Sequence, residues 1–305
     1  MSTAQRTIHG VVHSEIAFDI PAGACDCHVH VFGPVSRFPY SPNRAYTPPD
    51  ASIESLLKLQ HALYMDRVVI VHPSPYGADN RVSIDAALQL GLSRARVVAV
   101  IDPATISDAE LEQMHLEGVR GVRVNLESAG VHDPAAGGKL LQAASERVAS
   151  FGWHTQVYTT LDVIQALAPL MKTLPTPVVI DHMGRAEAAK GVNQPGFAEL
   201  LDLVRSGKAW VKLSAPHRIG PTPDDANTTA IAHAFINANI ERMVWGTDWP
   251  HPGGNRRENK EAIEPYSRID DGRALNRFAE WLDHDAKKIK QILVDNPAGL
   301  YDFPA

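Results

Sequence analysis

The run 26–30, with the sequence Asp-Cys-His-Val-His, gathers side chains that can do acid–base or metal chemistry. Alternate side chains of a strand share one face, so we expect Asp26, His28 and His30 to point one way and the two cysteines the other. Two imidazoles about 6.6 Å apart on one face can hold one oxygen atom or one metal ion. We interpret this run as the opening strand of a catalytic site rather than as a pair of incidental histidines.

The elements that must position these side chains alternate regularly along the chain. Short apolar or β-branched runs predict buried strands at about 26–32, 67–71, 97–101, 119–125, 153–158, 177–182, 209–214 and 242–247. Helical patterns fall between them, at about 52–65, 80–92, from 107, 137–151, 161–173, 196–206, 224–238 and 273–293. Such alternation is typical of a parallel sheet.

Eight strand–helix repeats predict an α/β fold, a single (β/α)8 TIM barrel. An open doubly wound sheet is the alternative, but the Gly-rich phosphate turn expected after an early strand is missing from the sequence. We expect one barrel domain over 23–305, preceded by an N-terminal tail over 1–22.

Composition narrows the class of protein. The 305 residues are 44% hydrophobic and 21% charged, which fits a globular protein in water. A net charge of −6 argues against nucleic acid as a partner. Two cysteines make no disulfide framework, and we see no signal peptide and no apolar run of membrane-spanning length, so we expect a cytoplasmic location and no membrane partner. The sequence leaves the oligomeric state open, a homo-oligomer included.

Polar side chains collect where the predicted strands end, which is the face that carries active sites in this kind of barrel. They are His28, His30, His72, Ser74, Arg123, Asn125, Tyr158, Asp181, His182, Arg185, Ser214, His217, Arg218, Asp248 and His251. So many His and Arg with so few acids indicate a pocket for an anionic, oxygen-rich substrate. Asp248, between a small residue and a proline-stopped turn, is the carboxylate that we expect to act as base.

Some of the polar residues have an equally good structural explanation. Asp181 is as consistent with orienting its neighbours as with catalysis. His72 precedes a proline in an apolar strand, so we expect a core histidine with satisfied hydrogen bonds. Lys212 lies in the middle of a strand and fits a structural role. Tyr46 sits in a long loop that could cover the barrel mouth, where it would either bind substrate or pack on the rim.

Three motifs together resemble a known family. The runs 26–30, 181–185 (Asp-His-Met-Gly-Arg) and 246–251 (Gly-Thr-Asp-Trp-Pro-His) are similar to those of the amidohydrolase superfamily, in its amidohydrolase-2 branch. With 31–34 (Val-Phe-Gly-Pro) and 121–125 (Gly-Val-Arg-Val-Asn), they are most similar to the 2-pyrone-4,6-dicarboxylate lactonase family and related lactonases. The resemblance extends over about residues 22–302.

The resemblance implies a hydrolase that opens a small anionic lactone, with a carboxylated, sulfonated or sugar-acid ring, in aromatic or sugar-acid catabolism. It implies that Asp248 activates water and that His28, His30 and His182 polarise the lactone carbonyl. It also implies a set of substrate-binding side chains: Arg123, Arg185, Arg218, Tyr158, Tyr46 and Ser74. The pyrone lactonases have a further arginine shortly after the fourth strand, whereas 126–130 carries Glu127 and no arginine here. This departure disfavours the pyrone dicarboxylate itself as the substrate.

The resemblance favours a site with no essential cofactor, because the pyrone lactonases need no divalent metal. Zinc is the alternative, as in the sulfonated-lactone relatives, and its ligands would be His28, His30, Asp248 and His182. Two other functions stay open. A metal-dependent decarboxylase or hydratase of the same branch would bind zinc tightly. A non-catalytic sugar-acid binder is less consistent with the sequence, since a buried carboxylate does not help to bind an anion.

Overall fold

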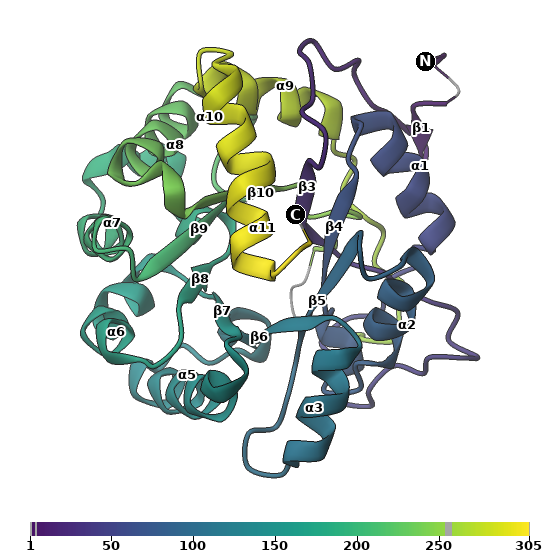
Figure 1. Cartoon of the computed structure of the whole chain (residues 1–305), viewed down its shortest axis with the longest axis vertical. Coiled ribbons are helices and arrows are strands. Elements are labelled where there is room, and N and C mark those ends of the chain that lie inside the picture. Colours follow the sequence, from purple (N-terminus) through teal and green to yellow (C-terminus); the bar gives the residue numbers. More distant parts are fainter. Residues whose placement is uncertain (1, 4, 254–257, 305) are drawn as a thin grey trace.

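The computed structural model of the protein describes residues 2–3, 5–253 and 258–304. Within these ranges, eight parallel strands form one sheet in the order β10-β9-β8-β7-β6-β5-β4-β3, surrounded by helices (Figure 1). Their bounds are β3 (Cys25–Val29), β4 (Arg67–Val71), β5 (Ala95–Ala99), β6 (Val119–Asn125), β7 (His154–Tyr158), β8 (Val178–Ile180), β9 (Ala209–Ser214) and β10 (Met243–Gly246). The bounds predicted for β4, β6 and β9 agree with these.

The sheet closes into a barrel just beyond the ends of β3 and β10. The backbone N–H of Asp248 donates to the carbonyl of His28 at 2.8 Å, and that of His30 donates to the carbonyl of Trp249 at 2.7 Å. These bonds make the turn after β10 part of the barrel wall and confirm the predicted (β/α)8 barrel.

Helices cover the outside of the barrel and bury their apolar faces against it. They are α1 (Ile53–Leu63), α2 (Arg81–Leu90), α3 (Asp108–Leu116), α4 (Leu126–Ala129), α5 (Pro134–Val148), α6 (Leu161–Thr173), α7 (Phe197–Arg205), α8 (Ala226–Ala238), α9 (Asp271–Trp281), α10 (Ala286–Lys290) and α11 (Asn296–Tyr301). The helical segments predicted over 273–293 are the two helices α9 and α10. Asp283 and His284 adopt left-handed backbone angles after α9, and Asp285 then caps a new helix, α10, through its carboxylate.

Strand β3 does not follow simple alternation. Its pairing with β4 shifts register between Asp26 and Val29, as in a β-bulge. Cys25 and Cys27 pack with valines of other strands in an apolar cluster inside the barrel. His28 faces the interior as well, although it directly follows Cys27. The bulge therefore turns two consecutive side chains inward, and the prediction that the cysteines face away from the imidazoles is wrong.

Asp26 is held by the neighbouring strand instead of by the site. Its carboxylate accepts hydrogen bonds from the backbone N–H of Thr247 at 2.9 Å and from the Thr247 hydroxyl at 2.7 Å. At its register position the paired residue of β4 is Val68, which belongs to the outer apolar core. Asp26 thus ties β3 to the end of β10 and does not share a face with the two histidines, contrary to the prediction.

The C-terminal segment closes the end of the barrel where the strands begin. Tyr301 and Phe303 pack on the interior cluster, and α11 crosses the barrel in Figure 1. Two arginines from the starts of strands hold this segment through its carbonyls: Arg96 Nε donates to Tyr301 at 3.0 Å, and Arg67 Nη2 donates to Pro304 at 2.7 Å. We call residues 296–304 the C-terminal plug.

The segment before β3 contains the short antiparallel strands β1 (Thr7–Ile8) and β2 (Val11–Val12). It docks at the start of α9, where the backbone N–H and the hydroxyl of Ser14 donate to the Asp270 carboxylate at 2.8 and 2.5 Å. The 1–22 region therefore has a small sheet of its own and packs against the barrel domain.

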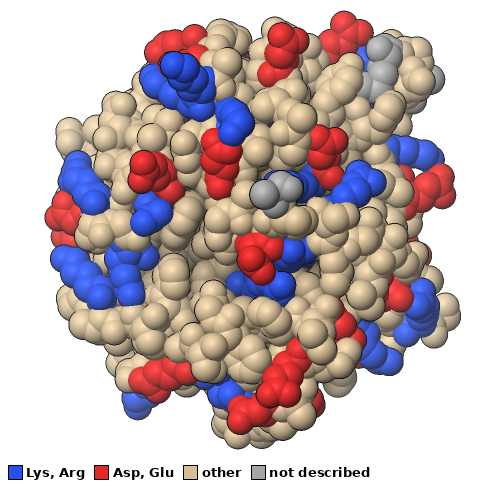
Figure 2. All heavy atoms as spheres, in the orientation of Figure 1, with Lys and Arg blue, Asp and Glu red and all other residues tan. Residues whose placement is uncertain are grey.

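Acidic and basic side chains are intermingled on the molecular face seen in Figure 2, and neither sign dominates it. Among the described residues, no helix combines the length and the apolar character that a membrane crossing requires.

Candidate active site

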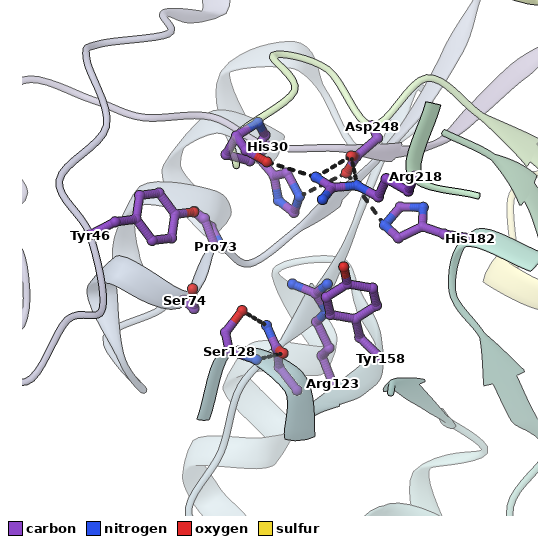
Figure 3. Close-up of a pocket in the computed structure, with 12 residues that line it drawn as sticks. His30, Tyr46, Pro73, Ser74, Arg123, Ser128, Tyr158, His182, Arg218 and Asp248 are labelled. Atoms are coloured by element: carbon purple, nitrogen blue, oxygen red, sulfur yellow. Dashed lines mark hydrogen bonds and ion pairs between the residues drawn. The ribbon is translucent and has the colours of Figure 1, made fainter. Parts of the chain in front are cut away.

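A cavity opens at the end of the barrel where the strands finish (Figure 3). Loops and strand ends from all around the barrel contribute to it, as expected for an active site in this fold. Its lining consists of His30, Tyr46, Pro73, Ser74, Arg123, Asn125, Ser128, Tyr158, His182, Arg218, Asp248 and Pro252.

Asp248 lies at the centre of the polar side chains. Its Oδ2 accepts a hydrogen bond from Arg218 Nε at 2.7 Å. Its Oδ1 faces the Nε2 atoms of His30 at 3.4 Å, His182 at 3.5 Å and His28 at 3.6 Å, and has no hydrogen-bond partner among the described residues. One carboxylate oxygen is thus anchored, and the other is surrounded by imidazole nitrogens.

The backbone that aims these side chains is unusual at three neighbouring strand ends. His182 after β8, Ala215 after β9 and Asp248 after β10 have φ angles of 49°, 49° and 71°, in the left-handed region that side chains other than glycine rarely adopt. Such conformations cost about 1–3 kcal/mol each and cluster at functional sites. The turns after these strands therefore hold the site in a shape that local preference alone would not produce.

A fully buried charged network supports the histidines from below. Asp181 accepts from Gln156 Nε2 at 3.0 Å and from Arg123 Nε at 3.3 Å, and its Oδ1 lies 3.3 Å from His28 Nδ1. Lys212 Nζ donates to Gln156 Oε1 at 2.7 Å and lies 3.7 Å from Asp181. Since each buried charge has partners, the network can be held without water.

The protonation states follow from burial and these neighbours. Burial by itself raises the pKa of Asp248, but the Arg218 guanidinium and the surrounding imidazoles outweigh it and hold that pKa well below its usual range. Burial and the positive charge of Lys212 lower the pKa of His28 to about 3. Burial also lowers the pKa of His30, and that of His182 well below its ordinary value. At neutral pH the site contains an ionised Asp248 among neutral imidazoles.

The tautomers of two histidines can be read from their partners. His30 Nδ1 lies 2.7 Å from the carbonyl of Val71, which can only accept, so Nδ1 carries the proton. His28 Nδ1 faces the Asp181 carboxylate, which also accepts. In their neutral forms both rings therefore point an Nε2 lone pair at Asp248 Oδ1. These two lone pairs and the carboxylate oxygen repel one another unless a cation or a proton lies between the imidazoles and Asp248.

The donor set fits a divalent metal ion. His28, His182 and Asp248 present one ligand atom each within 4.8 Å of one another, with His30 alongside. Ligands at zinc distances in a tetrahedron lie about 3.4 Å apart, close to the 3.4–3.6 Å between the imidazole nitrogens and Asp248 Oδ1. Asp181 and the Val71 carbonyl fix the ring tautomers as the supporting groups of metal-bound histidines do.

Most of the residues predicted for the site lie together. His28 sits beneath the cavity against Asp248, and Arg185 does not line the cavity but pairs with Glu127 at 2.5 Å. The other predicted residues line it: Asp248, His30, His182, Arg123, Arg218, Tyr158, Tyr46 and Ser74. His72 is the core histidine expected, with Ser83 Oγ at 2.9 Å and the Gly77 carbonyl at 3.1 Å.

Sequence reasoning missed two residues of the site, Ser128 and Gln156, although it had named their partners Asn125 and Lys212. Ser128 and Asn125 line the cavity as a pair, since Asn125 caps α4 by accepting from the backbone N–H of Ser128 at 2.9 Å. Gln156 and Lys212 form the buried network described above. For Gln156 the available signal was a polar residue at an inward position of β7.

The comparisons with known proteins agree with this geometry. The amidohydrolase family model matches residues 25–303. The chain is 39% identical to a 2-pyrone-4,6-dicarboxylate hydrolase of Comamonas testosteroni (94% of this chain, 93% of that protein) and 38% identical to a 4-sulfomuconolactone hydrolase of Rhizobium radiobacter (94% and 92%). A solved structure of a putative 2-pyrone-4,6-dicarboxylic acid hydrolase from Pseudomonas putida superposes with a TM-score of 0.76 at 32% identity, covering 94% of this chain and 100% of that one. The chain belongs to the amidohydrolase family.

Proposed function

We propose that this protein hydrolyses a small lactone that carries an anionic or hydroxylated substituent. Relatives at 34–39% identity over nearly the whole chain are lactone hydrolases that act on pyrone dicarboxylate or on sulfomuconolactone. The observation that carries the proposal is the environment of Asp248: an ionised carboxylate at the cavity, with one oxygen anchored by Arg218 and the other facing three imidazoles.

Asp248 acts as the general base in this proposal. Ring opening needs a proton removed from water while the water attacks the ester carbonyl. Arg218 occupies Oδ2, so Oδ1 is the oxygen left to accept that proton. The low pKa of Asp248 keeps it ionised, and therefore able to accept a proton, throughout the neutral range.

The charge that develops on the carbonyl oxygen needs donors close to Asp248. His182 Nδ1 lies 2.8 Å from Ser214 Oγ, a hydroxyl that can either donate or accept a hydrogen bond. His182 can therefore carry its proton on Nε2 and donate it to the carbonyl oxygen. Neutral His28 and His30 cannot do so, because their protons are on Nδ1. The Arg218 guanidinium is the second donor that lines the cavity beside Asp248. Tyr46 and Ser74 on the opposite wall would orient the ring.

A metal-loaded form of the same site is favoured by the two lone pairs that face Asp248. His28, His30, His182 and Asp248 would hold the ion, which would supply Lewis-acid polarisation of the carbonyl and lower the pKa of a bound water. The role of Arg218 as anchor of Oδ2 and the role of Asp181 as partner of His28 are the same in both forms. The absence of an essential metal, favoured by the family resemblance, stays a prediction.

The test is a pH-indicator screen of the purified protein against carboxylated, sulfonated and sugar lactones, with zinc measured on the same sample. We expect proton release with at least one class and a release slower by about 10²–10⁴-fold with an Asp248→Asn sample. Release at equal rates in both samples, or from no lactone, would contradict the proposal. Activity that survives removal of all metal supports the metal-free form, and stoichiometric zinc with activity lost on chelation supports the metal-loaded one. Stoichiometric zinc without proton release from any lactone would favour the decarboxylase or hydratase alternative.

We also propose a cytoplasmic location and a role in aromatic or sugar-acid catabolism. Both cysteines are free and buried, as is usual in a reducing compartment. The substrate class that responds in the screen tests the catabolic role directly.

A further inference from the structure

The arginines that line the cavity already have carboxylate partners. Arg123 contacts Asp181 through both Nε and Nη2 at 3.3 Å, and Arg218 contacts Asp248 through Nε and Nη2 at 2.7 Å. The Arg218–Asp248 pair is close to neutral as a unit, whereas Asp181 is shared between Arg123 and Lys212. Arg123 still borders the cavity, so its guanidinium can hold one anionic group of a substrate.

A third arginine at the rim is neutralised in the same way. Arg185 Nη1 lies 2.5 Å from Glu127 Oε1, and the guanidinium sits 5.5 Å from the centre of the Tyr158 ring, which lines the cavity. The other carboxylate oxygen, Glu127 Oε2, is buried and has no hydrogen-bond partner among the described residues. A second anionic group that bound at Arg185 would therefore lie beside the negative charge of Glu127.

We propose that Glu127 determines the charge of the substrate: it neutralises Arg185, so that the site accepts lactones with one anionic group and disfavours lactones with two. The identity of the substrate as a lactone rests on the proposed function, whereas the selectivity for charge is a property of binding alone. Neutral hydroxyl substituents are compatible with Glu127, because a carboxylate accepts hydrogen bonds from them.

The physical basis is the balance of charge around the cavity. Three guanidiniums face three carboxylates, those of Asp181, Asp248 and Glu127, and the imidazoles of the site are neutral. The ammonium of Lys212 also faces Asp181, so the network below the cavity has one further positive charge. Glu127 differs from the two aspartates because its pair lies at the rim, outside the network that holds the imidazoles. Removing its charge leaves Arg185 with a planar fork of donors that can bind a carboxylate through two hydrogen bonds.

The experiment measures binding without turnover. The affinities of benzoate and of isophthalate, unreactive rings with one and two carboxylates, are measured by titration calorimetry for the wild type and for Glu127→Gln. We expect the ratio of isophthalate to benzoate affinity to rise by about 10- to 100-fold in Glu127→Gln, the range for one new hydrogen bond to a charged group. The double variant Glu127→Gln/Arg185→Gln should return the ratio to that of the wild type.

The matched control is Glu187→Gln, which removes one negative charge near Arg185 in sequence but breaks an exposed pair with Lys190 instead. Its ratio should equal that of the wild type. An unchanged ratio in Glu127→Gln, or an equal rise in Glu187→Gln, would overturn the proposal. Circular dichroism verifies that each variant is folded. A wild type that opens no lactone would defeat the proposed function, but it would leave these binding ratios as a complete test of Glu127.

Discussion

The two ends of the barrel interior are built from the same strands and differ completely in chemistry. Near the strand starts, cysteines and valines form an apolar layer under Tyr301 and Phe303. Near the strand ends, the interior carries Asp181, Lys212 and the imidazoles around Asp248. In β3 the interior side chains change from apolar to polar between two consecutive residues: Cys27 lies in the apolar layer and His28 in the polar one.

The difference teaches that stability and chemistry are separated along the barrel axis. Burying charged groups costs free energy unless each is paired, and left-handed backbone at the turns adds to that cost. The apolar layer and the C-terminal plug bury side chains that favour folding and that do not line the cavity. Substitutions at one end should therefore change catalysis, and substitutions at the other should change stability.

The largest effect is expected at the polar end, from Asp248→Asn. Asparagine keeps the size and most hydrogen bonds of the aspartate but cannot take the proton from water. We expect kcat to fall about 10²–10⁴-fold, the usual contribution of a general base. Steady-state kinetics on a lactone from the screen measures this effect. Asp225→Asn, which alters the N-cap carboxylate of α8 outside the cavity, is the control. Wild-type turnover in Asp248→Asn would mean that another group is the base.

The next effect is expected at the apolar end, from Phe303→Ala. Phe303 is buried in the interior cluster, and the guanidiniums of Arg96 and Arg67 lie 4.8 and 5.2 Å from its ring centre. Truncating a buried phenylalanine costs about 3–5 kcal/mol of stability. We expect a lower urea midpoint with kcat unchanged at 25 °C. A proportionate loss of kcat in folded protein would show that the two ends are coupled and would break the comparison.

The sequence predicted the barrel well because its signal is periodic and local. Strand β4 is a run whose burial on both faces is visible in residue type, and the strand ends then indicated Asp248 and its histidines. The bulge in β3 could not be predicted, since it shows only in the register against β4. The pairing of Arg185 with Glu127 joins residues from two different strand ends and depends on tertiary placement.

A third prediction uses pH to test the apolar end. His154 is buried with its ring edge-on to Tyr301 at 5.2 Å, and burial lowers its pKa from 6.5 to about 3. Between these two pH values the unfolded chain binds a proton at His154 that the folded protein does not, so stability falls as pH falls through this window. The slope from this group is at most about 1.4 kcal/mol per pH unit.

Urea denaturation at several pH values measures that slope. His154→Gln should show a shallower loss of stability than the wild type between about pH 6 and pH 4, because the variant has no proton to take up there. Parallel curves for the two proteins would show that His154 is protonated in the folded state as readily as in the unfolded one.

The smallest effect is expected from Tyr46→Phe at the cavity wall. Tyr46 is buried, lines the cavity and interacts with Ser74 through its hydroxyl. Loss of one neutral hydrogen bond to substrate should raise KM about 2- to 10-fold and leave kcat unchanged. Tyr64→Phe, at an exposed tyrosine outside the cavity, should change neither constant. Unchanged kinetics in Tyr46→Phe would mean that the ring packs on the rim without binding substrate.

The C-terminal plug has a consequence for how the chain is made. Synthesis delivers the strands in order, and the last of them, β10, ends at Gly246, whereas α11 begins only at Asn296. The apolar layer inside the barrel therefore stays uncovered, at the end where the strands begin, while the ribosome translates the stretch between Gly246 and Asn296. A nascent chain paused in that stretch would expose Cys25, Cys27 and their valine neighbours to chaperones and to oxidants. In the finished protein these residues are buried.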